Sequence, residues 1–440
     1  MNKSVYQIIF LNFLLASLFL FEKVAANLWL LLPIIIFFAS RNNISSIFWL
    51  VVSQIIVTIP ELPLTLTQVF ILFWITNNIT FISNNLKQFL SKNIRLFFLL
   101  LFISLLTALY LYNFKYFLEL AKNIIAILLA IKIYKDKISP LLISIIVASA
   151  AFIAALPFFL KQWGVDIIMT SLQEKGTHFR EGASRFAALG DFNYIGMTIA
   201  ISFAIALLIF VSRDYTIWLK KESKIFYYFF SVSVFISPIS ILVTLSRGAI
   251  LSFITALIGV FISTKIFNIS RNKLLKINNN VIIILLIIVA IGIPILINNW
   301  STIDNYWTAL VDYQKNESSN NLLYSRDKVF SRAIEGFKEK PFTGFVDNSW
   351  EPYYAHNNYL DAASYSGIFG LIIYTIITII PFILFIRTKQ KPVYLPLIVT
   401  YFFTWFITLS LSVYSLKTFW MLWAMCLLYL RNIPAIKIKK

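Results

Sequence analysis

The chain has 440 residues, of which 59% are hydrophobic, and its mean hydropathy of +0.81 excludes a soluble globular protein. The net charge of +19 is spread over short loops without a recognition module, which argues against nucleic-acid binding. The single cysteine, Cys426, allows no internal disulfide bond, and two histidines distant in sequence argue against a zinc site.

Apolar runs of bilayer-spanning length recur along the whole chain. They are continuous rather than alternating, as in Val281–Ile297, which favours helices over the strands of a closed barrel. The predicted fold is all-α: a polytopic transmembrane helix bundle of about 12–14 spans, with a large periplasmic loop that carries short helices. The first run lacks a cleavage site and is interpreted as a retained span. The candidate cores are residues 5–21, 24–39, 44–59, 62–79, 94–112, 117–134, 138–160, 192–211, 225–244, 249–267, 281–297, 363–386, 393–411 and 418–430.

Lysine and arginine concentrate in alternate short loops and in both tails, which predicts that both termini are cytoplasmic. Two loops, residues 161–191 and 298–362, then lie outside the cytoplasm, and the second is far longer than a normal helix connection. It contains a predicted amphipathic helix, Tyr324–Phe337, which Pro341 and Gly344 end. Without an internal repeat or linker, residues 1–440 are predicted to form a single membrane domain, with residues 298–362 as its cap.

Two arginines are candidates for binding a phosphate. Arg247 follows Leu245-Ser246 and precedes Gly248 between two apolar stretches, where a guanidinium suits a phosphate bidentately. The alternative is an arginine that extends from a helix end to lipid headgroups. Arg185 precedes a predicted span on the same side, where it would share the charge of a pyrophosphate or remain a solvated loop charge.

His356 ends the large loop and is a candidate general base for a hydroxyl, because imidazole exchanges a proton near neutral pH. The alternative is a loop histidine bonded to its neighbours. Asn357 or Asn358 is predicted to cap the next span, and Asn357 is also a candidate substrate-binding residue. Arg326 belongs to a basic set in the same loop that either holds an anionic donor or forms a solvated face.

Other catalytic patterns are absent from the sequence. It has no glycine-rich phosphate loop, no Gly-x-Ser-x-Gly elbow and no Asp-x-Asp pair, so a nucleotide-driven or metal-assisted reaction is not supported, and we expect no cofactor. A transporter, such as a lipid-linked oligosaccharide flippase, is the alternative to an enzyme. Transporters usually show internal repeats and midplane charges, whereas the candidate residues here gather on one outer face, which favours an enzyme.

Four short motifs lie within residues of about 180–375: Leu245-Ser246-Arg247-Gly248-Ala249, Lys340-Pro341-Phe342-Thr343-Gly344-Phe345, His356-Asn357-Asn358-Tyr359-Leu360 and Gly367-Ile368-Phe369-Gly370-Leu371. In their order and spacing they resemble the O-antigen ligase and O-antigen polymerase superfamily. The upstream Arg185…Gly190…Phe192-Asn193 is similar to the segment before an earlier span of the family. A departure is the stretch with Asp347, Trp350 and Glu351, where relatives often have another glycine.

The resemblance implies a C-type glycosyltransferase of the bacterial inner membrane. Such enzymes use an undecaprenyl-diphosphate-linked glycan at the periplasmic face, without metal or nucleotide. Ligases transfer it to the lipid A-core, polymerases to another lipid-linked glycan, and further relatives to protein hydroxyls. Carried onto this chain, the resemblance implies that Arg185 and Arg247 bind the diphosphate and that His356 activates the acceptor hydroxyl. The motifs do not separate ligase from polymerase.

Overall fold

The computed structural model describes residues 3–21, 31–56, 65–89, 114–161, 192–244, 247–266, 326–344, 357–388, 390–410 and 416–431. The chain forms two compact units that interleave in sequence: residues 1–67 with 140–320, and residues 68–139 with 321–440. The first unit contains α1 (Lys3–Leu18), α3 (Leu31–Ala39), α4 (Asn43–Ile55), α9 (Pro140–Phe152), α10 (Ala155–Lys161), α11 (Phe192–Val211), α12 (Arg213–Glu222), α13 (Lys224–Val243) and α14 (Arg247–Ile266). The second contains most of α5 (Leu66–Asn77) and α6 (Ile79–Phe89), α8 (Phe114–Lys135), α17 (Arg326–Glu339), α18 (Asn358–Arg387), α19 (Lys391–Ser410) and α20 (Lys417–Arg431).

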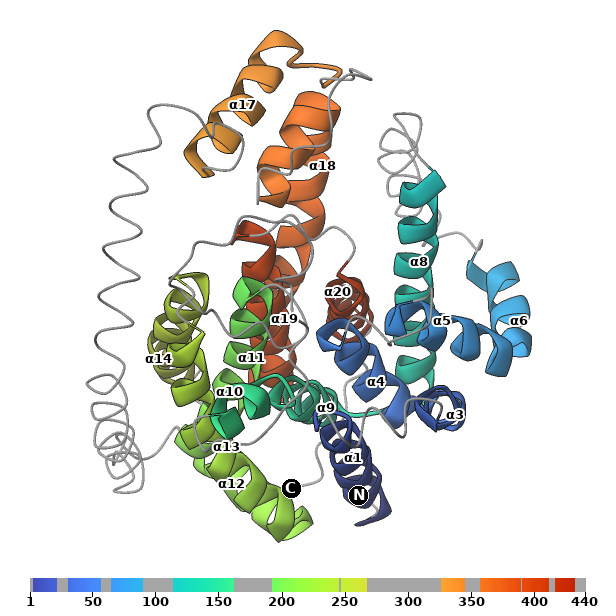
Figure 1. The fold of residues 1–440 in the computed structure, drawn as a ribbon, viewed down its shortest axis with the longest axis vertical. Helices are drawn as coiled ribbons and strands as arrows, with labels where there is room; N and C mark the ends of the chain where they lie inside the picture. Colours follow the sequence, from blue (N-terminus) through green and yellow to red (C-terminus); the bar gives the residue numbers. More distant parts are fainter. Residues whose placement is uncertain are drawn as a thin grey trace. The chain divides into compact units, whose positions relative to one another are not determined.

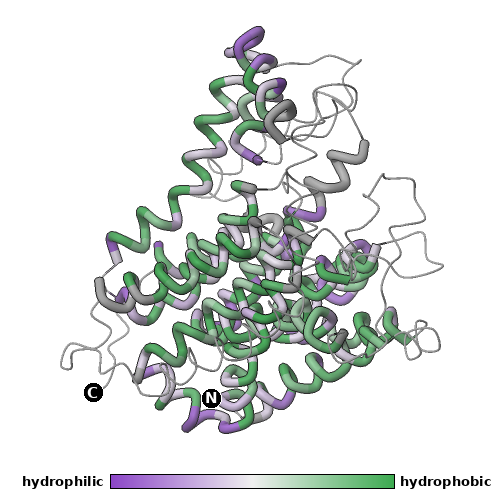
Figure 2. Tube along the Cα trace, turned by 60° about the vertical axis from the view of Figure 1, so that its left-hand side comes forward, coloured by the Kyte–Doolittle hydropathy of each residue, from purple (hydrophilic) through white to green (hydrophobic). Residues whose placement is uncertain are grey.

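The predicted all-α polytopic bundle is confirmed. Within the described residues, five helical stretches are long and apolar enough to cross a membrane: Pro140–Leu160, Tyr194–Val211, Lys224–Leu242, Asn358–Arg387 and Lys391–Leu409. Four shorter apolar helices accompany them, and Figure 2 shows mainly hydrophobic long helices with hydrophilic residues towards their ends. The predicted cores 94–112 and 281–297 lie outside the described residues. The single-domain arrangement stays a prediction.

In the first unit, α11 packs against α9, α13 and α14, and α4 packs against α9 and α1. Buried polar side chains join these helices in pairs. Asn12 of α1 donates from Nδ2 to Ser45 Oγ (2.9 Å) and accepts from Trp49 Nε1 (2.8 Å). Because apolar helices gain little from hydrophobic contact inside a lipid environment, such hydrogen bonds help fix which helices pair.

One predicted span of the first unit is interrupted. The sequence predicts a continuous core over residues 138–160, whereas the helix breaks between Phe152 and Ala155 into α9 and α10. Ser240 of α13 donates from Oγ to the Ala155 carbonyl at 2.8 Å. This bond joins α13 to the first residue of α10, directly after the break.

In the second unit, α19 packs against α18 and α20, and α8 packs along α20 (Figure 1). Trp423 of α20 donates from Nε1 to the Ile377 carbonyl (2.8 Å), and Tyr401 of α19 donates to the Thr378 carbonyl (2.9 Å). The predicted amphipathic helix Tyr324–Phe337 is confirmed as α17, within two residues at each end. Its Ala333 packs with Phe330 and with Leu360 of α18.

Candidate functional site: two glycine-supported helix starts

Arg247 is the first residue of α14 and lies three positions after Thr244, the C-cap of α13. We call this junction between the two helices the Arg247 corner. Thr244 closes α13: its N–H donates to the carbonyls of Ser240 (3.1 Å) and Ile241 (3.2 Å), and its hydroxyl donates to the Ile241 carbonyl (2.7 Å). The backbone of Arg247 is therefore held at a helix start, where exposed N–H groups favour anions. The side chain of Arg247 lies outside the described atoms.

Gly196 of α11 contacts both sides of this corner. A Cβ at Gly196 would lie 2.4 Å from the Cβ of Ala249 and 3.1 Å from Thr244 Oγ1. Further along, the rings of Phe203 and Phe253 lie 4.9 Å apart, so α11 and α14 run parallel. α11 begins at Phe192, about 6 Å of helix before Gly196. Two helix N-termini therefore lie at the same end of the first unit, which is a favourable place for an anion.

The predicted partner arginine, Arg185, lies outside the described residues, seven positions before α11 begins. The segment that contains it leads directly into the helix that supports the Arg247 corner. A joint role of the two arginines therefore stays a prediction.

Asn357 is the N-cap of α18, which confirms the predicted cap. Its Oδ1 accepts hydrogen bonds from the N–H groups of Tyr359 (2.9 Å) and Leu360 (3.1 Å). Its Nδ2 donates to the Leu409 carbonyl (2.9 Å) at the end of α19. The amide thus ties two helices together, and its contact with substrate stays a prediction. His356 immediately precedes this cap and lies outside the described residues.

The start of α18 folds back along the rest of the helix at Gly367. Gly367 has φ 63° and ψ −160°, a conformation essentially restricted to glycine. The rings of Tyr359 and Tyr374 lie 4.9 Å apart, and the hydroxyls of Tyr359 and Thr378 lie 2.6 Å apart. If α18 were straight, the nineteen positions from Tyr359 to Thr378 would place these two residues about 28 Å apart. A Cβ at Gly370 would lie 2.9 Å from the Ala362 carbonyl, so this glycine also permits the reversal.

A polar network joins the two halves of α18 to each other and to α19. Asn358 donates from Nδ2 to the Tyr374 hydroxyl (2.9 Å), and Trp405 of α19 donates from Nε1 to the Tyr359 hydroxyl (2.8 Å). Buried hydrogen-bond networks of this kind rigidify a region because leaving any member without its bond is costly. Asn358 and Tyr359, the second and third residues after His356, are therefore held by contacts with the rest of α18 and with α19.

Gly344 and Gly367 allow the turn Lys340–Gly344, which we call the cap turn, to pack directly against α18 at its reversal. We call this pair of glycines the glycine latch. The Pro341 carbonyl accepts a hydrogen bond from the Ile368 N–H at 2.7 Å. A Cβ at Gly344 would lie 2.2 Å from the Tyr365 carbonyl carbon, and one at Gly367 would lie 2.5 Å from that of Phe342. Gly344 also has a positive φ of 76°. The cap turn and the segment around Gly367, which are separate in the sequence, are therefore in direct contact.

Two charged side chains of the second unit are buried, and no sequence pattern predicted their burial. Asp361 of α18 is 0% exposed, and Lys417 of α20 is 6% exposed. An acidic group in the first turn of a helix is favoured by the helix dipole, although burying a charge is costly without compensation. In the sequence Asp361 resembles an ordinary charge at the end of a span, because the reversal at Gly367 is not visible there.

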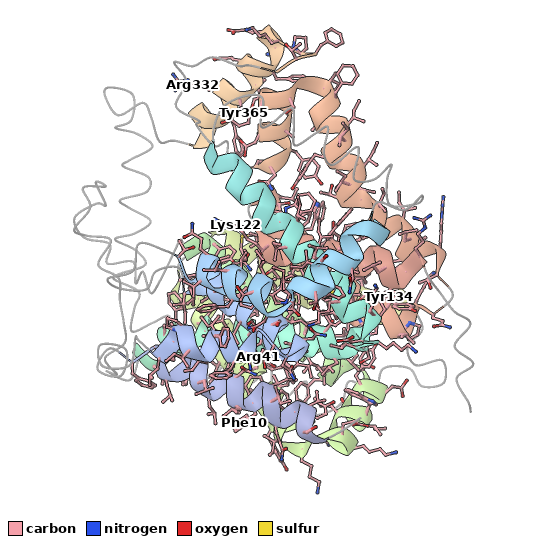
Figure 3. All side chains as sticks on the ribbon, turned by 90° about the vertical axis from the view of Figure 1, so that its right-hand side faces the viewer. Phe10, Arg41, Lys122, Tyr134, Arg332 and Tyr365 are labelled. Carbon is pink, nitrogen blue, oxygen red and sulfur yellow. The ribbon has the colours of Figure 1, made fainter. Side chains whose placement is uncertain are left out.

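The basic residues of the cap are mostly exposed. Arg332, Lys338 and Lys340 are exposed, and Figure 3 shows Arg332 on α17. Arg326 opens α17, but its side chain lies outside the described atoms. Their binding of an anionic donor stays a prediction. Among the described residues, no group of three or more His, Cys, Asp or Glu side chains has the arrangement of a metal site.

The described helices, with one of these helix starts in each unit, define a polytopic, all-α membrane protein. Residues 232–375 match the family model described as O-antigen ligase. The matched region includes the Arg247 corner, α17, the glycine latch and the first half of α18. The match confirms the resemblance to the O-antigen ligase and polymerase superfamily and supports a ligase-type, multi-pass membrane enzyme. No curated protein matches the chain.

Proposed function

We propose that this protein is an inverting, metal-independent C-type glycosyltransferase of the bacterial inner membrane. It moves an undecaprenyl-diphosphate-linked glycan to an acceptor hydroxyl at the periplasmic face, and both of its termini are cytoplasmic. The observation that carries the proposal is the family match over residues 232–375, which contains both Arg247 and His356. The acceptor is the lipid A-core or a second lipid-linked glycan, so the protein serves lipopolysaccharide biosynthesis.

Arg247 and Arg185 bind the donor diphosphate in this proposal. Support comes from the position of Arg247 at the start of α14, beside the parallel start of α11. Guanidinium groups and helix N-termini both stabilise the negative charge that grows on a departing diphosphate. Arg326, at the start of α17, adds a further cation for the donor. A glycosyl diphosphate is already activated, so no nucleotide is needed.

His356 acts as the general base. Its imidazole takes the proton of the acceptor hydroxyl while the acceptor oxygen attacks the anomeric carbon. The bond from that carbon to the diphosphate oxygen breaks, its electron pair stays on undecaprenyl diphosphate, and attack from the opposite side inverts the anomeric centre. Support comes from Asn357, which directly follows His356 and whose side chain bonds to both α18 and α19.

The test uses purified protein in vesicles with a lipid-linked glycan donor and an acceptor, with a chelator present and no nucleotide. We expect transferred glycan and free undecaprenyl diphosphate. Movement of the intact donor across the bilayer without bond cleavage would instead support a flippase. Activity lost with chelator and restored by a divalent ion would contradict metal independence.

The acceptor is identified by deleting the gene and separating the surface glycan on a gel. Loss of every long chain from the core would show a ligase. A core that carries one repeat would show a polymerase.

A further inference from the structure

The second half of α18 carries a continuous apolar stripe on its surface. The stripe follows helical spacing of three and four residues, which places its members on one face. Its exposed residues are Phe369, Ile372, Ile376, Ile379, Ile383 and Ile386. α18 is long and apolar enough to cross a membrane, so this face is suited to lipid acyl chains.

The stripe extends beyond the helix onto the cap turn. Phe342 is 67% exposed, and its ring lies 6.5 Å from that of Phe369, which is 61% exposed. The glycine latch holds this turn against α18 through backbone contacts, so Phe342 keeps its exposed position beside the stripe. An aromatic ring fixed in this way is costly to leave in water and favourable to place in lipid.

Exposed cations precede Phe342 in the sequence. Lys338 and Lys340 are both exposed, and the exposed Glu339 lies between them. Lysine stems lie along apolar surface while their ammonium groups reach anionic phosphates. Large apolar residues beside lysines are typical of segments that lie in the membrane interface.

We propose that the turn Lys340–Gly344 is a membrane anchor. Phe342 inserts into the edge of the acyl-chain region beside α18, and Lys338 and Lys340 bind the phosphates of anionic headgroups. The surface fits a lipid bilayer rather than a protein, because it continues the apolar face of a membrane-crossing helix. The anchor holds α17 at the membrane surface. The proposal of this anchor is based on burial and contacts alone and is independent of the proposed reaction.

The test places an environment-sensitive fluorophore on Phe342→Cys and, as a matched control, on Ser331→Cys of the exposed face of α17. The native Cys426 is buried and stays unlabelled. Full-length protein is reconstituted in vesicles of phosphatidylcholine and phosphatidylglycerol that contain a spin-labelled lipid quencher. We expect blue-shifted emission and several-fold stronger quenching at position 342 than at position 331.

Equal emission and quenching at both positions would overturn the anchor. Disulfide-linked dimers of Phe342→Cys, together with weak quenching by lipid, would instead show that a second copy covers the stripe, and would also overturn it. A second measurement concerns the cations. Replacing phosphatidylglycerol by phosphatidylcholine should reduce the quenching at position 342, and Lys338→Gln with Lys340→Gln should remove that dependence on headgroup charge. Unchanged dependence on phosphatidylglycerol in this double variant would contradict the role of the lysines.

Discussion

The Arg247 corner and the glycine latch both depend on glycine, but for different reasons. At the corner, Gly196 has ordinary helical backbone and makes room for a side chain, because an added Cβ would meet the Cβ of Ala249. At the latch, Gly344 and Gly367 have positive φ angles, and an added Cβ would meet backbone atoms. A second substitution can shorten a side chain that the new Cβ would meet, but no substitution removes a backbone atom.

The difference suggests a division of roles between the two regions. Helices that pack through side chains tolerate small relative shifts, which suits the proposed binding of a charged diphosphate at Arg247. The latch holds the cap turn against backbone atoms of α18, and the Asn357 cap fixes the residue directly after His356. Fixed backbone suits the proposed role of His356 as a base that must meet one proton in one geometry. The predictions below break or sharpen this comparison, from the largest expected effect to the smallest.

His356→Ala should lower turnover by about 10²- to 10⁴-fold while leaving donor binding largely intact, because the base acts only as the acceptor loses its proton. In the unmodified protein the rate should rise with pH across the neutral range, since only neutral imidazole accepts a proton. Single-turnover rates and donor binding, measured across pH on both proteins, check this. A variant with the original rate and pH profile would leave His356 as a loop residue.

Arg247→Ala should reduce activity by about 10²- to 10³-fold, the usual effect of losing a group that stabilises developing negative charge. Arg247→Lys should not restore it, because lysine lacks the bidentate fork. The measurement is glycan transfer at matched membrane expression. Arg41→Ala is the control, because Arg41 is exposed and its guanidinium lies over the ring of Phe37 (4.7 Å). Near-normal transfer by Arg247→Ala would remove this residue from the site.

Gly367→Ala should lower the free energy of unfolding by more than about 3 kcal/mol, since it combines a glycine-only backbone conformation with a clash against backbone. Thermal unfolding is followed with a thiol-reactive dye, because Cys426 is the only cysteine and is buried. Gly259→Ala in α14 is the control: its Cβ would meet nothing within 4 Å, so it should be neutral or stabilising. Equal unfolding temperatures for the two variants would contradict the latch.

Gly196→Ala should cost about 1–3 kcal/mol, the usual range for overpacking between helices. Adding Ala249→Gly should restore part of the loss, since it removes the atom that the new Cβ meets at 2.4 Å. The coupling is read from a double-mutant cycle of unfolding temperatures and donor affinities. Additive effects would show that the helices accommodate the new Cβ at position 196 without the involvement of Ala249.

Asn357→Ala should cost about 1 kcal/mol for the lost cap, with a further contribution from the bond to the Leu409 carbonyl. Asn42→Ala is the matched control, because Asn42 caps α4 by accepting from Ile44 N–H (2.9 Å) and Ser45 N–H (3.3 Å). Only Asn357→Ala should also lower turnover. An equal fall in turnover for both variants would mean that the cap does not position His356.

Much of the helical content was predictable from local sequence. The predicted core 192–211 coincides with α11, and the cores 225–244 and 249–267 lie within two residues of α13 and α14 at each end. The extent of α17 and the cap at Asn357 were also correct. These features depend on the length of an apolar run or on a side chain that bonds to its own backbone. Such causes act within a few residues, so the sequence contains them.

The reversal of α18, the break between α9 and α10 and the burial of Asp361 and Lys417 were decided only by tertiary structure. Residues far along the chain contact these regions, such as Ser240 beside the break and Pro341 at the latch. The glycines show the reason most directly. Gly196 makes room for a side chain, Gly367 makes room for backbone, and a Cβ on Gly259 would contact nothing. In sequence all three are simply glycines within apolar stretches, because the atoms that a Cβ would meet are brought near only when the helices pack.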